Sequence, residues 1–443
     1  MTHANRLTVA ILLGLAPIAA AQAEPRLQLI SHAFGNTNLA RGAHEPAISA
    51  DGRFVAFYTT ATDIVPTDGY SGSDVFVYDV DCQRAEIVSI TSTGQPADDS
   101  SGGKLSLSGD GRYVVFASSA RNLVPHNNTG PLHTQVYLVD RHNKNSIKLI
   151  SAAPGTAGSP VAEPGNLPSS HPSISADGRF VAFASNATNL VSENIHSQQI
   201  FLYRIADGKI QLVSRNVDGV SPTIYSAYPQ ISADGRYVAF QSMASDLIKE
   251  PVSSHASGPH TYIRDRLGGF NLLVDRNNAN EIATSGSGTM AISGDGTRVS
   301  FNSNAYNLWP GMQQSKNQVF VRDVPAQRLA IATSNPGLPS RTLGKDTTLS
   351  HDGRYVAFHS SIAGFGPEPG EPWNGLYLID LLNGQKELLT PGLNGVQENG
   401  TSDQPSISAD GLRVAFRSTS GNLQGSLGEG VYLSDARRGV CIR

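Results

Sequence analysis

Short stretches in which apolar and polar residues alternate recur along almost the whole chain. The clearest copy, PSISADGRFVAFAS at residues 172–185, has an apolar piece, an Asp-Gly pair and then an alternating piece. A period of two is typical of strands with one buried face, and Asp-Gly between two such runs is a strong hairpin signal. We expect a type I′ turn at each Asp-Gly pair, in which both central residues have positive φ. Each copy therefore begins with two antiparallel strands.

This unit occurs seven times, with starts 57 to 67 residues apart. Its Asp-Gly pairs are Asp51-Gly52, Asp110-Gly111, Asp177-Gly178, Asp234-Gly235, Asp295-Gly296, Asp352-Gly353 and Asp410-Gly411. A third β-rich run follows each hairpin, as in DVFVYD at 74–79, and a fourth follows after a few residues, as in AEIVS at 85–89. Each copy is therefore predicted to be a four-stranded antiparallel meander.

One four-stranded sheet cannot bury both of its faces, whereas copies stacked radially cover one another and protect their edges. The repeats therefore predict an all-β fold, a seven-bladed β-propeller of four-stranded antiparallel blades, in a single domain over residues 24–443. The blades are expected to begin near residues 46, 105, 172, 229, 290, 347 and 405.

An extra strand precedes the first blade. The run LQLIS at 27–31 matches a fourth strand, so we expect it to return to the last blade and close the ring. The C-terminal GVCIR at 439–443 is then either the normal fourth strand of the last blade or a surplus one.

The first 23 residues look like a secretory signal peptide. MTHANR ends in Arg6, the apolar stretch LTVAILLGLAPIAA follows, and Ala21-Gln22-Ala23 forms an A-x-A cleavage site. We therefore expect residues 1–23 to be removed and the rest of the chain to be periplasmic or secreted, in a bacterium. A retained membrane anchor is the alternative, although the apolar stretch is short. No later segment approaches transmembrane length, so stable membrane insertion is not expected.

Composition narrows the classes of partner. The chain is 39% hydrophobic and 16% charged, which is enough apolar content for a large core. Its net charge of -4 gives no broad basic surface, so nucleic acid is not an expected partner. We expect a monomer.

The two cysteines bear on the closure of the ring. Cys82 lies between the third and fourth strands of the first blade, and Cys441 lies near the end of the chain. Ring closure would make these two blades neighbours, and an oxidising compartment favours pairing. A Cys82–Cys441 disulfide is therefore predicted, with two unpaired thiols as the alternative.

The connections between blades suggest where a ligand would bind. The second-to-third and fourth-to-first connections are long and differ between copies, and variable loops on a rigid scaffold commonly bind ligands. The residue before the Pro, or its equivalent, at the start of each first strand is polar and different in every copy. It reads Glu45, Lys104, His171, Tyr228, Thr289, Asp346 and Gln404. We expect these side chains to ring the mouth of the central channel, and all except Thr289 are candidate ligand-binding residues. An ordinary solvated rim is the alternative.

The repeat resembles that of TolB-type, WD40-like propellers, which is roughly P-x-W-S-P-D-G-x-x-I-A-F-x-S. The clearest copies here read P-x-[IL]-S-A-D-G-R-[FY]-V-A-F-x-S, and the match covers nearly the whole mature chain. The resemblance implies the propeller fold. TolB itself looks like an α/β domain followed by six blades, so we expect this protein to differ from TolB.

A second resemblance is to secreted bacterial proteins with repeats of the form SxASNLVPGDTNGxxDVFVYD. This chain keeps that frame in TTATDIVPTDGYSGSDVFVYD at 59–79. In that family the D-T-N-G-x-x-D loop looks like a small calcium loop, since calcium prefers closely spaced oxygen ligands. The resemblance makes Asp68 and Asp74, with Ser71 between them, a weak calcium candidate. An ordinary turn is the alternative, and no other cofactor is expected.

Two functions follow from these features. The first is a non-catalytic module that binds a protein, peptide or glycan through the variable face, in the envelope or outside the cell. The alternative is a metal-assisted enzyme at the channel mouth. Some similar propellers are polysaccharide lyases that hold a metal through His and Gln, and His171, Gln404 and His44 fall in that neighbourhood. No catalytic motif with diagnostic spacing, such as H-E-x-x-H, is present in the sequence.

Overall fold

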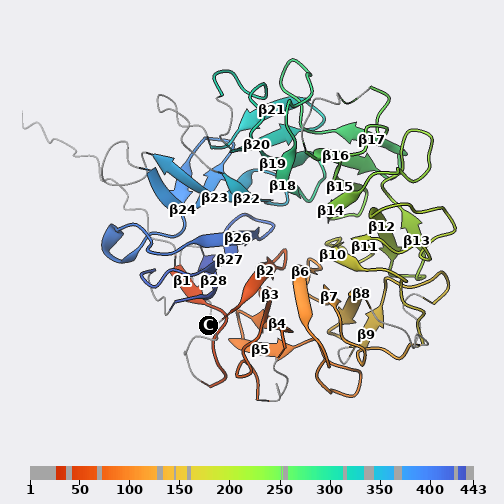
Figure 1. Ribbon diagram of the computed structural model, residues 1–443. Coiled ribbons are helices and arrows are strands. Elements are labelled where there is room, and N and C mark those ends of the chain that lie inside the picture. Colours follow the sequence, from red (N-terminus) through yellow and green to blue (C-terminus); the bar gives the residue numbers. More distant parts are fainter. Residues whose placement is uncertain are drawn as a thin grey trace, which may run out of the picture.

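Seven β-sheets surround a common centre in the computed structural model of the chain (Figure 1). The structure describes residues 26–35, 42–66, 72–126, 133–143, 146–156, 161–250, 252, 258–312, 317–333, 344–363, 372–423 and 428–435. The predicted signal peptide and the C-terminal GVCIR lie outside the described residues. Within the described part, no helix has the length and apolar character needed to cross a membrane.

Each sheet has four antiparallel strands, which confirms the predicted seven-bladed propeller. The innermost strands begin a few residues before the predicted starts. From the inside outward, blade 1 contains β2 (His44–Ile48), β3 (Phe54–Thr59), β4 (Asp74–Asp79) and β5 (Arg84–Ile87), and blade 2 contains β6 (Ser101–Leu107), β7 (Tyr113–Ser118), β8 (Gln135–Asp140) and β9 (Ser146–Leu149). Blade 3 contains β10 (Ser169–Ile174), β11 (Phe180–Ser185), β12 (Gln199–Arg204) and β13 (Ile210–Leu212). Blade 4 contains β14 (Ser226–Ile231), β15 (Tyr237–Ser242), β16 (His260–Asp265) and β17 (Phe270–Leu273).

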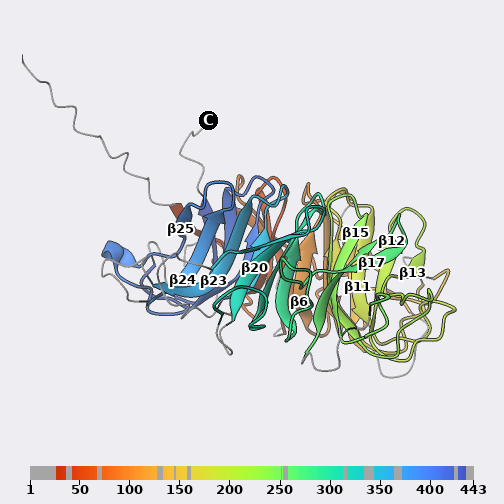
Figure 2. The same cartoon turned by 90° about the horizontal axis from the view of Figure 1, so that it is seen from above.

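In the same order, blade 5 contains β18 (Ser287–Ile292), β19 (Arg298–Ser303), β20 (Gln318–Asp323) and β21 (Arg328–Ile331). Blade 6 contains β22 (Lys345–Leu349), β23 (Tyr355–Ala363), β24 (Pro372–Asp380) and β25 (Lys386–Leu388). Blade 7 contains β26 (Ser402–Ile407), β27 (Arg413–Ser418), β28 (Gly430–Asp435) and β1 (Arg26–Leu29). A single short 3-10 helix, η1 (Leu393–Gly395), is found among the described residues. Seen from the side, the strands run across the thickness of a flat ring (Figure 2). We call the face with the first-to-second and third-to-fourth turns the turn face, and the opposite one the loop face.

The N-terminal strand closes the ring, as predicted. β1 pairs with β28 in antiparallel register, from Arg26 opposite Asp435 to Leu29 opposite Tyr432. The contact continues beyond β1, because the amide of Val431 donates a hydrogen bond to Ser31 Oγ at 2.9 Å. Blade 7 therefore combines strands from both ends of the chain.

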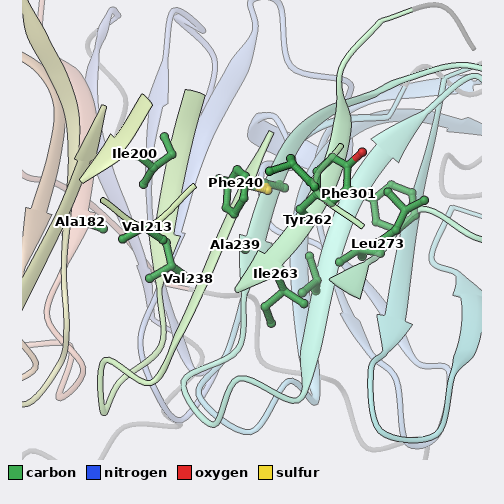
Figure 3. Packing of buried hydrophobic residues seen from close by; sticks show 14 of the residues in the cluster. Ala182, Ile200, Val213, Val238, Ala239, Phe240, Tyr262, Ile263, Leu273 and Phe301 are labelled. Carbon is green, nitrogen blue, oxygen red and sulfur yellow. The ribbon is translucent and has the colours of Figure 1, made fainter. Parts of the chain in front are cut away.

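Stacked aromatic pairs fill the middle of each blade. Each pair joins the second and third strands, with ring centroids 5.6 to 6.2 Å apart. The pairs are Phe57–Phe76, Phe116–Tyr137, Phe183–Phe201, Phe240–Tyr262, Phe301–Phe320, Phe358–Tyr377 and Phe416–Tyr432. Buried residues of neighbouring blades merge into common clusters, as Figure 3 shows for Phe240 of blade 4 and Phe301 of blade 5. Contact between blades therefore forms the core.

The predicted type I′ turn at Asp-Gly is wrong. The seven glycines have positive φ, but none of the paired aspartates is among the described residues with positive φ. In the first copy Gly52 N donates to Ser49 O at 2.9 Å, and Phe54 N donates to Ser49 Oγ at 2.9 Å. The Ser49 hydroxyl also bonds Asp51 Oδ1 at 2.5 Å. Ser49 N still donates to Phe54 O at 2.9 Å, so residues 50–53 form a four-residue loop. The side chains of Ser49 and Asp51 accept hydrogen bonds from the amides of Phe54 and Arg53 there.

The glycine of each loop also lies against the preceding blade. A Cβ added at Gly235 would lie 2.4 Å from Phe180 Cδ2, and the same contact relates Gly111 to Phe54. In blade 5 the aromatic residue is replaced by Arg298, whose Nη1 donates to Gly353 O at 3.0 Å. The sequence Asp-Gly-Arg-[Phe/Tyr] thus encodes contacts between blades as well as the turn.

The arginine of the motif pairs with the aspartate that ends the third strand. Arg112 and Asp140 are 2.7 Å apart, and Arg354 and Asp380 are 2.6 Å apart. These arginines are about two-fifths exposed, so the pairs are surface interactions of modest worth.

Candidate functional site

The inner strand of most blades carries a β-bulge at the position that varies in sequence. In blade 3 the register with β11 shifts between Ser170 and Ser173, so that His171 and Pro172 form the bulge. Five of the predicted residues have left-handed φ values of 49° to 54° there. They are Glu45, His171, Tyr228, Asp346 and Gln404. Such values are uncommon for these residue types, and bulges re-aim side chains, so the inner strands present these residues through a shared backbone irregularity.

Blades 2 and 5 depart from this geometry. Blade 2 has one more residue in its bulge, and Gly103 rather than Lys104 has the positive φ. In blade 5 Thr289 is not among the residues with positive φ. Thr289 Oγ1 instead accepts a hydrogen bond from the amide of Asp346 at 3.0 Å.

Neighbouring members of this set contact one another. Gln404 and Glu45 form two hydrogen bonds, from Glu45 N to Gln404 Oε1 and from Gln404 Nε2 to Glu45 Oε1, each 2.9 Å. Lys104 Nζ lies 3.5 Å from Glu45 Oε2. His171 and Tyr228 meet edge to face, with ring centroids 4.6 Å apart. We call these seven positions, 45, 104, 171, 228, 289, 346 and 404, the variable ring.

The charges of the variable ring act on one another. Burial raises the pKa of Asp346, and among the charges that shift it are Lys104 and Glu45, from blades 2 and 1. Burial lowers the pKa of His171, and the nearby positive charge of Lys104 lowers it further. His171 is therefore neutral at pH 7, and its Nδ1 is 2.9 Å from the hydroxyl of Ser170.

A second variable position lies directly beside the first, although it was not among the predicted site residues. It is the x of V-A-F-x-S in the second strand, which reads Tyr58, Ala117, Ala184, Gln241, Asn302, His359 and Arg417. These residues pair across the strands with the residues before the bulge, for example Tyr58 with His44 and Arg417 with Asp403. Variation at this x, in a motif that otherwise repeats closely, was the signal that could have revealed it.

Charged side chains of this second set gather on blades 6 and 7. Arg417 contacts Asp403 Oδ1 at 3.4 Å and Glu429 Oε1 at 2.7 Å, and Lys345 Nζ lies 3.9 Å from Asp403 Oδ2. Burial and the charge of Lys345 lower the pKa of His359 to about 4. The charged side chains of blades 6 and 7 in this region therefore form a network of ion pairs.

A pocket of about 340 Å³ opens at the variable ring on blades 1 to 3. Tyr58, Lys104 and His171 line it, together with several serine and threonine residues of blades 1 to 3. We call this cavity the ring-mouth pocket. The small residues Gly102 and Ala117, which pair across β6 and β7, line the pocket and help to leave this space open.

Two glycines form part of the wall of the ring-mouth pocket. A Cβ added at Gly102 would lie 2.7 Å from the ring of Tyr58, so Tyr58 packs flat on that backbone. At Gly103 no heavy atom lies within 4 Å of the Cβ position, and φ is +71°. The backbone is therefore bare at this point of the pocket lining, and a Cβ there would meet no neighbouring atom.

His171 and Gln404 are held by different partners, Ser170 and Tyr228 for the first and Glu45 for the second. Among the residues that the structure describes, no group of three or more His, Cys, Asp or Glu is placed to hold a metal ion. For the calcium candidate, Asp68 and Ser71 lie outside the described residues. Asp74 is fully buried and accepts a hydrogen bond from Ser89 Oγ at 2.6 Å.

Cys82 is exposed in the turn between β4 and β5, and its Sγ is 3.8 Å from Arg53 Nη2. Its predicted partner Cys441 lies outside the described residues, so the disulfide stays a prediction.

Comparison with known proteins supports the fold. No family model matches the chain, and no curated protein matches it. Among solved structures, an oligogalacturonate lyase from Vibrio parahaemolyticus is 11% identical with a TM-score of 0.52, over 93% of this chain and 97% of that one. The β-propeller domain of the Trilobed protease from Pyrococcus furiosus is 10% identical with a TM-score of 0.54, over 89% and 95%.

TolB from Acinetobacter baumannii also matches, at 14% identity with a TM-score of 0.40, over 75% of this chain. The chain spans 62% of the length of that TolB. The match to the β-propeller domain from Pyrococcus furiosus confirms the predicted resemblance at the level of the fold. The Pyrococcus furiosus domain is described as having an open velcro topology. The present ring is instead closed by β1 and β28.

Proposed function

We propose that this protein is a non-catalytic binding module that takes a glycan into the ring-mouth pocket. The observation that carries the proposal is the bare backbone of Gly103, which lies in a pocket among variable side chains on an otherwise repetitive scaffold. Ligand sites usually combine such a concave space with a few polar groups.

The chemistry of the pocket favours a sugar over an apolar ligand. His171 is neutral, so its ring can both donate and accept hydrogen bonds with hydroxyl groups. Ser170 and Thr134 add hydroxyls to the lining. Tyr58 lines the same pocket, and Tyr228, beside His171, is 52% exposed. Such aromatic rings can pack on the apolar face of a sugar while their hydroxyls stay in water.

A carboxylate on the glycan is favoured by Lys104. Its side chain is 42% exposed, and Glu45 is paired with it at 3.5 Å while also bonding Gln404. A ligand carboxylate could share the ammonium group with Glu45. We therefore expect acidic oligosaccharides, which carry uronic acids, to bind better than neutral ones.

The signal-like N-terminus supports a location in the periplasm or outside the cell, where such oligosaccharides are met. Proteins and peptides are the other classes of partner that the loop face could accommodate.

The test is calorimetric titration with oligogalacturonate and with the neutral cellotetraose. Asparagine tolerates positive φ, so Gly103→Asn should fill the pocket with little backbone strain and abolish binding. Lys104→Gln should lower the affinity for the acidic ligand about tenfold, because one charged hydrogen bond is lost, and should leave the affinity for the neutral ligand unchanged.

Gly94→Asn is the matched control, because Gly94 also has positive φ, +81°, and open space at its Cβ position. That variant should bind as the parent does. The glycan proposal fails if neither sugar binds, or if Gly103→Asn binds both normally. Peptide binding that Gly103→Asn abolishes, in the absence of sugar binding, would assign the pocket to peptides instead.

A further inference from the structure

A second cavity, of about 310 Å³, lies between blades 4 and 5 and shares no lining residue with the ring-mouth pocket. It is lined in blade 4 by residues 248–250, which follow β15, by β17 and by the segment after β17, and in blade 5 by β20 and the turn after it. Figure 1 shows where β17 and β20 lie in the ring. Its walls carry three cationic side chains, Lys249, Arg276 and Arg322, against one carboxylate, Glu250. We call it the interblade cavity.

Arg322 is a buried cation that pairs with no carboxylate among the described residues. It is 4% exposed, and its Nη1 donates only to the carbonyl oxygens of Arg276 and Asn277, at 3.2 and 3.4 Å. The next residue, Asp323, lies instead 3.7 Å from Arg298 Nε. Arginine stays protonated in proteins, and a buried charge is costly unless a counter-charge accompanies it.

The undescribed segments that adjoin this region in sequence hold no hidden acid. Residues 251, 253–257, 313–316 and 334–343 contain neither Asp nor Glu. Arg276 cannot serve as a counter-charge, and its own Nη2 is paired with Glu250 Oε2 at 2.6 Å. The lining of the cavity is therefore left with an excess of positive charge.

The equivalent arginine of blade 4 shows how such a position is otherwise satisfied. Arg264 lies opposite Asn271 in the strand pairing, and its Nη1 donates to Asn271 Oδ1 at 3.4 Å. Arg322 lies opposite Leu329, whose side chain has no hydrogen-bond acceptor. The two blades thus differ at the residue opposite the arginine, because only the Asn271 side chain can accept a hydrogen bond from the guanidinium group.

We propose that the interblade cavity binds a tetrahedral oxyanion, held by Arg322 and Arg276 with Lys249 beside it. The planar guanidinium fork matches phosphate and sulfate oxygens, and two arginines can bind one anion from two sides. The cavity also has an apolar side that includes Leu272 and Val324, which suits an organic body attached to the anion. The source is either a free ion or the phosphate of a small molecule such as a phosphorylated sugar.

The experiment is calorimetric titration of the full-length protein with inorganic phosphate, glucose 6-phosphate and glucose, at constant ionic strength. Saturable binding of the phosphate compounds, but not of glucose, is expected. Equal affinity for both would indicate a free ion as the ligand, and tighter glucose 6-phosphate a phosphorylated molecule.

Arg322→Gln should weaken phosphate at least about tenfold, since it removes a charged fork, whereas the matched Arg264→Gln should leave it unchanged. Glu250→Gln tests the site without altering a buried residue, because the Glu250 side chain is 56% exposed. This substitution frees Arg276 from its ion pair and should increase the affinity for phosphate about threefold or more. The proposal is overturned if the parent protein binds no phosphate compound, if Arg264→Gln weakens binding as much as Arg322→Gln, or if Glu250→Gln leaves the affinity unchanged.

Discussion

Glu398 lies beside a position that glutamine occupies in blades 2 and 3. Gln135 and Gln199 begin the third strands of blades 2 and 3 and bond Ser151 and Ser214 behind them. Blade 6 has Gly375 at this position, and Glu398 Oε1 lies 3.7 Å from where its Cβ would be. Glu398 is 5% exposed, and its second oxygen accepts a hydrogen bond from Ser402 Oγ at 2.5 Å. Burial raises the pKa of Glu398 to about 7.

This raised pKa makes stability depend on pH. The folded state holds the proton more tightly than the unfolded state, so the contribution is complete below about pH 4.5 and is lost as pH rises through about 7. We expect Glu398→Gln to remove this dependence and to raise the free energy of unfolding at pH 8 by up to about 3 kcal/mol. Urea titrations between pH 5 and 8 measure the effect. Glu163→Gln, at an exposed position, is the control and should show the same dependence of unfolding free energy on pH as the parent. If Glu398→Gln keeps the pH dependence of the parent, the prediction is contradicted.

His359 should act in the opposite direction. Its pKa is lowered to about 4 by burial, so the neutral folded form contributes stability that is present above pH 6.5 and is lost as pH falls through 4. We expect His359→Gln to be less sensitive to acid between pH 6.5 and 4 than the parent, as measured by the thermal midpoint. His196→Gln, at an exposed position, is the control and should keep the sensitivity of the parent. Equal acid sensitivity of His359→Gln and the parent would refute this role for His359.

At the scale of the strand and its turn, each loop glycine has two separate roles. Gly235 supplies a positive φ of 72° and lets the loop approach Phe180 of the previous blade. Gly219 has a positive φ of 79° but faces open space. The pair therefore separates backbone strain from lost contact between blades.

We expect Gly219→Ala to cost about 1–2 kcal/mol for the left-handed conformation alone. Gly235→Ala should cost a further 1–3 kcal/mol or so, because its methyl group overpacks the contact with Phe180. Denaturant unfolding of both variants measures the difference. Equal losses would show that the glycine contact does not contribute to packing between the blades.

The sequence predicted the elements well because the hairpin signal recurs in every copy. It failed at the turn type, since Asp-Gly alone does not reveal that Ser49 and Asp51 take over hydrogen bonds of the loop. It placed Glu45 and its counterparts correctly on the first strands. It could not reveal that a bulge turns His171 toward Tyr228, because backbone conformation at that position depends on register with the next strand.

At the scale of the whole molecule, blade 7 depends on the N-terminal strand. β1 covers the edge of β28, and Ile30 just beyond it is 1% exposed. The closing strand could be predicted because LQLIS matches the fourth strands. The ring-mouth and interblade cavities could not, since each needs side chains from different blades to be placed together.

Removing this strand should weaken the whole ring. A chain that begins at Ala33 loses β1 and Ile30, and burial of one such side chain alone contributes roughly 1.5–3 kcal/mol. We expect a lower thermal midpoint and self-association through the open edge of β28, detected by light scattering after size exclusion. A chain that begins at Glu24 keeps the strand and should behave as the parent does. A monomeric Ala33 chain with an unchanged midpoint would show that closure by β1 is dispensable.

The pairing of β1 with β28 also determines when folding of the ring can be completed. Ser31 and Val431, which are bonded across it, are 400 positions apart. The first strand to leave the ribosome therefore has no partner until synthesis is almost complete, and contacts so distant in sequence form slowly. Until then the backbone groups of β1 that pair with β28 have no partner. A product that terminates before β28 leaves β1 without this partner permanently.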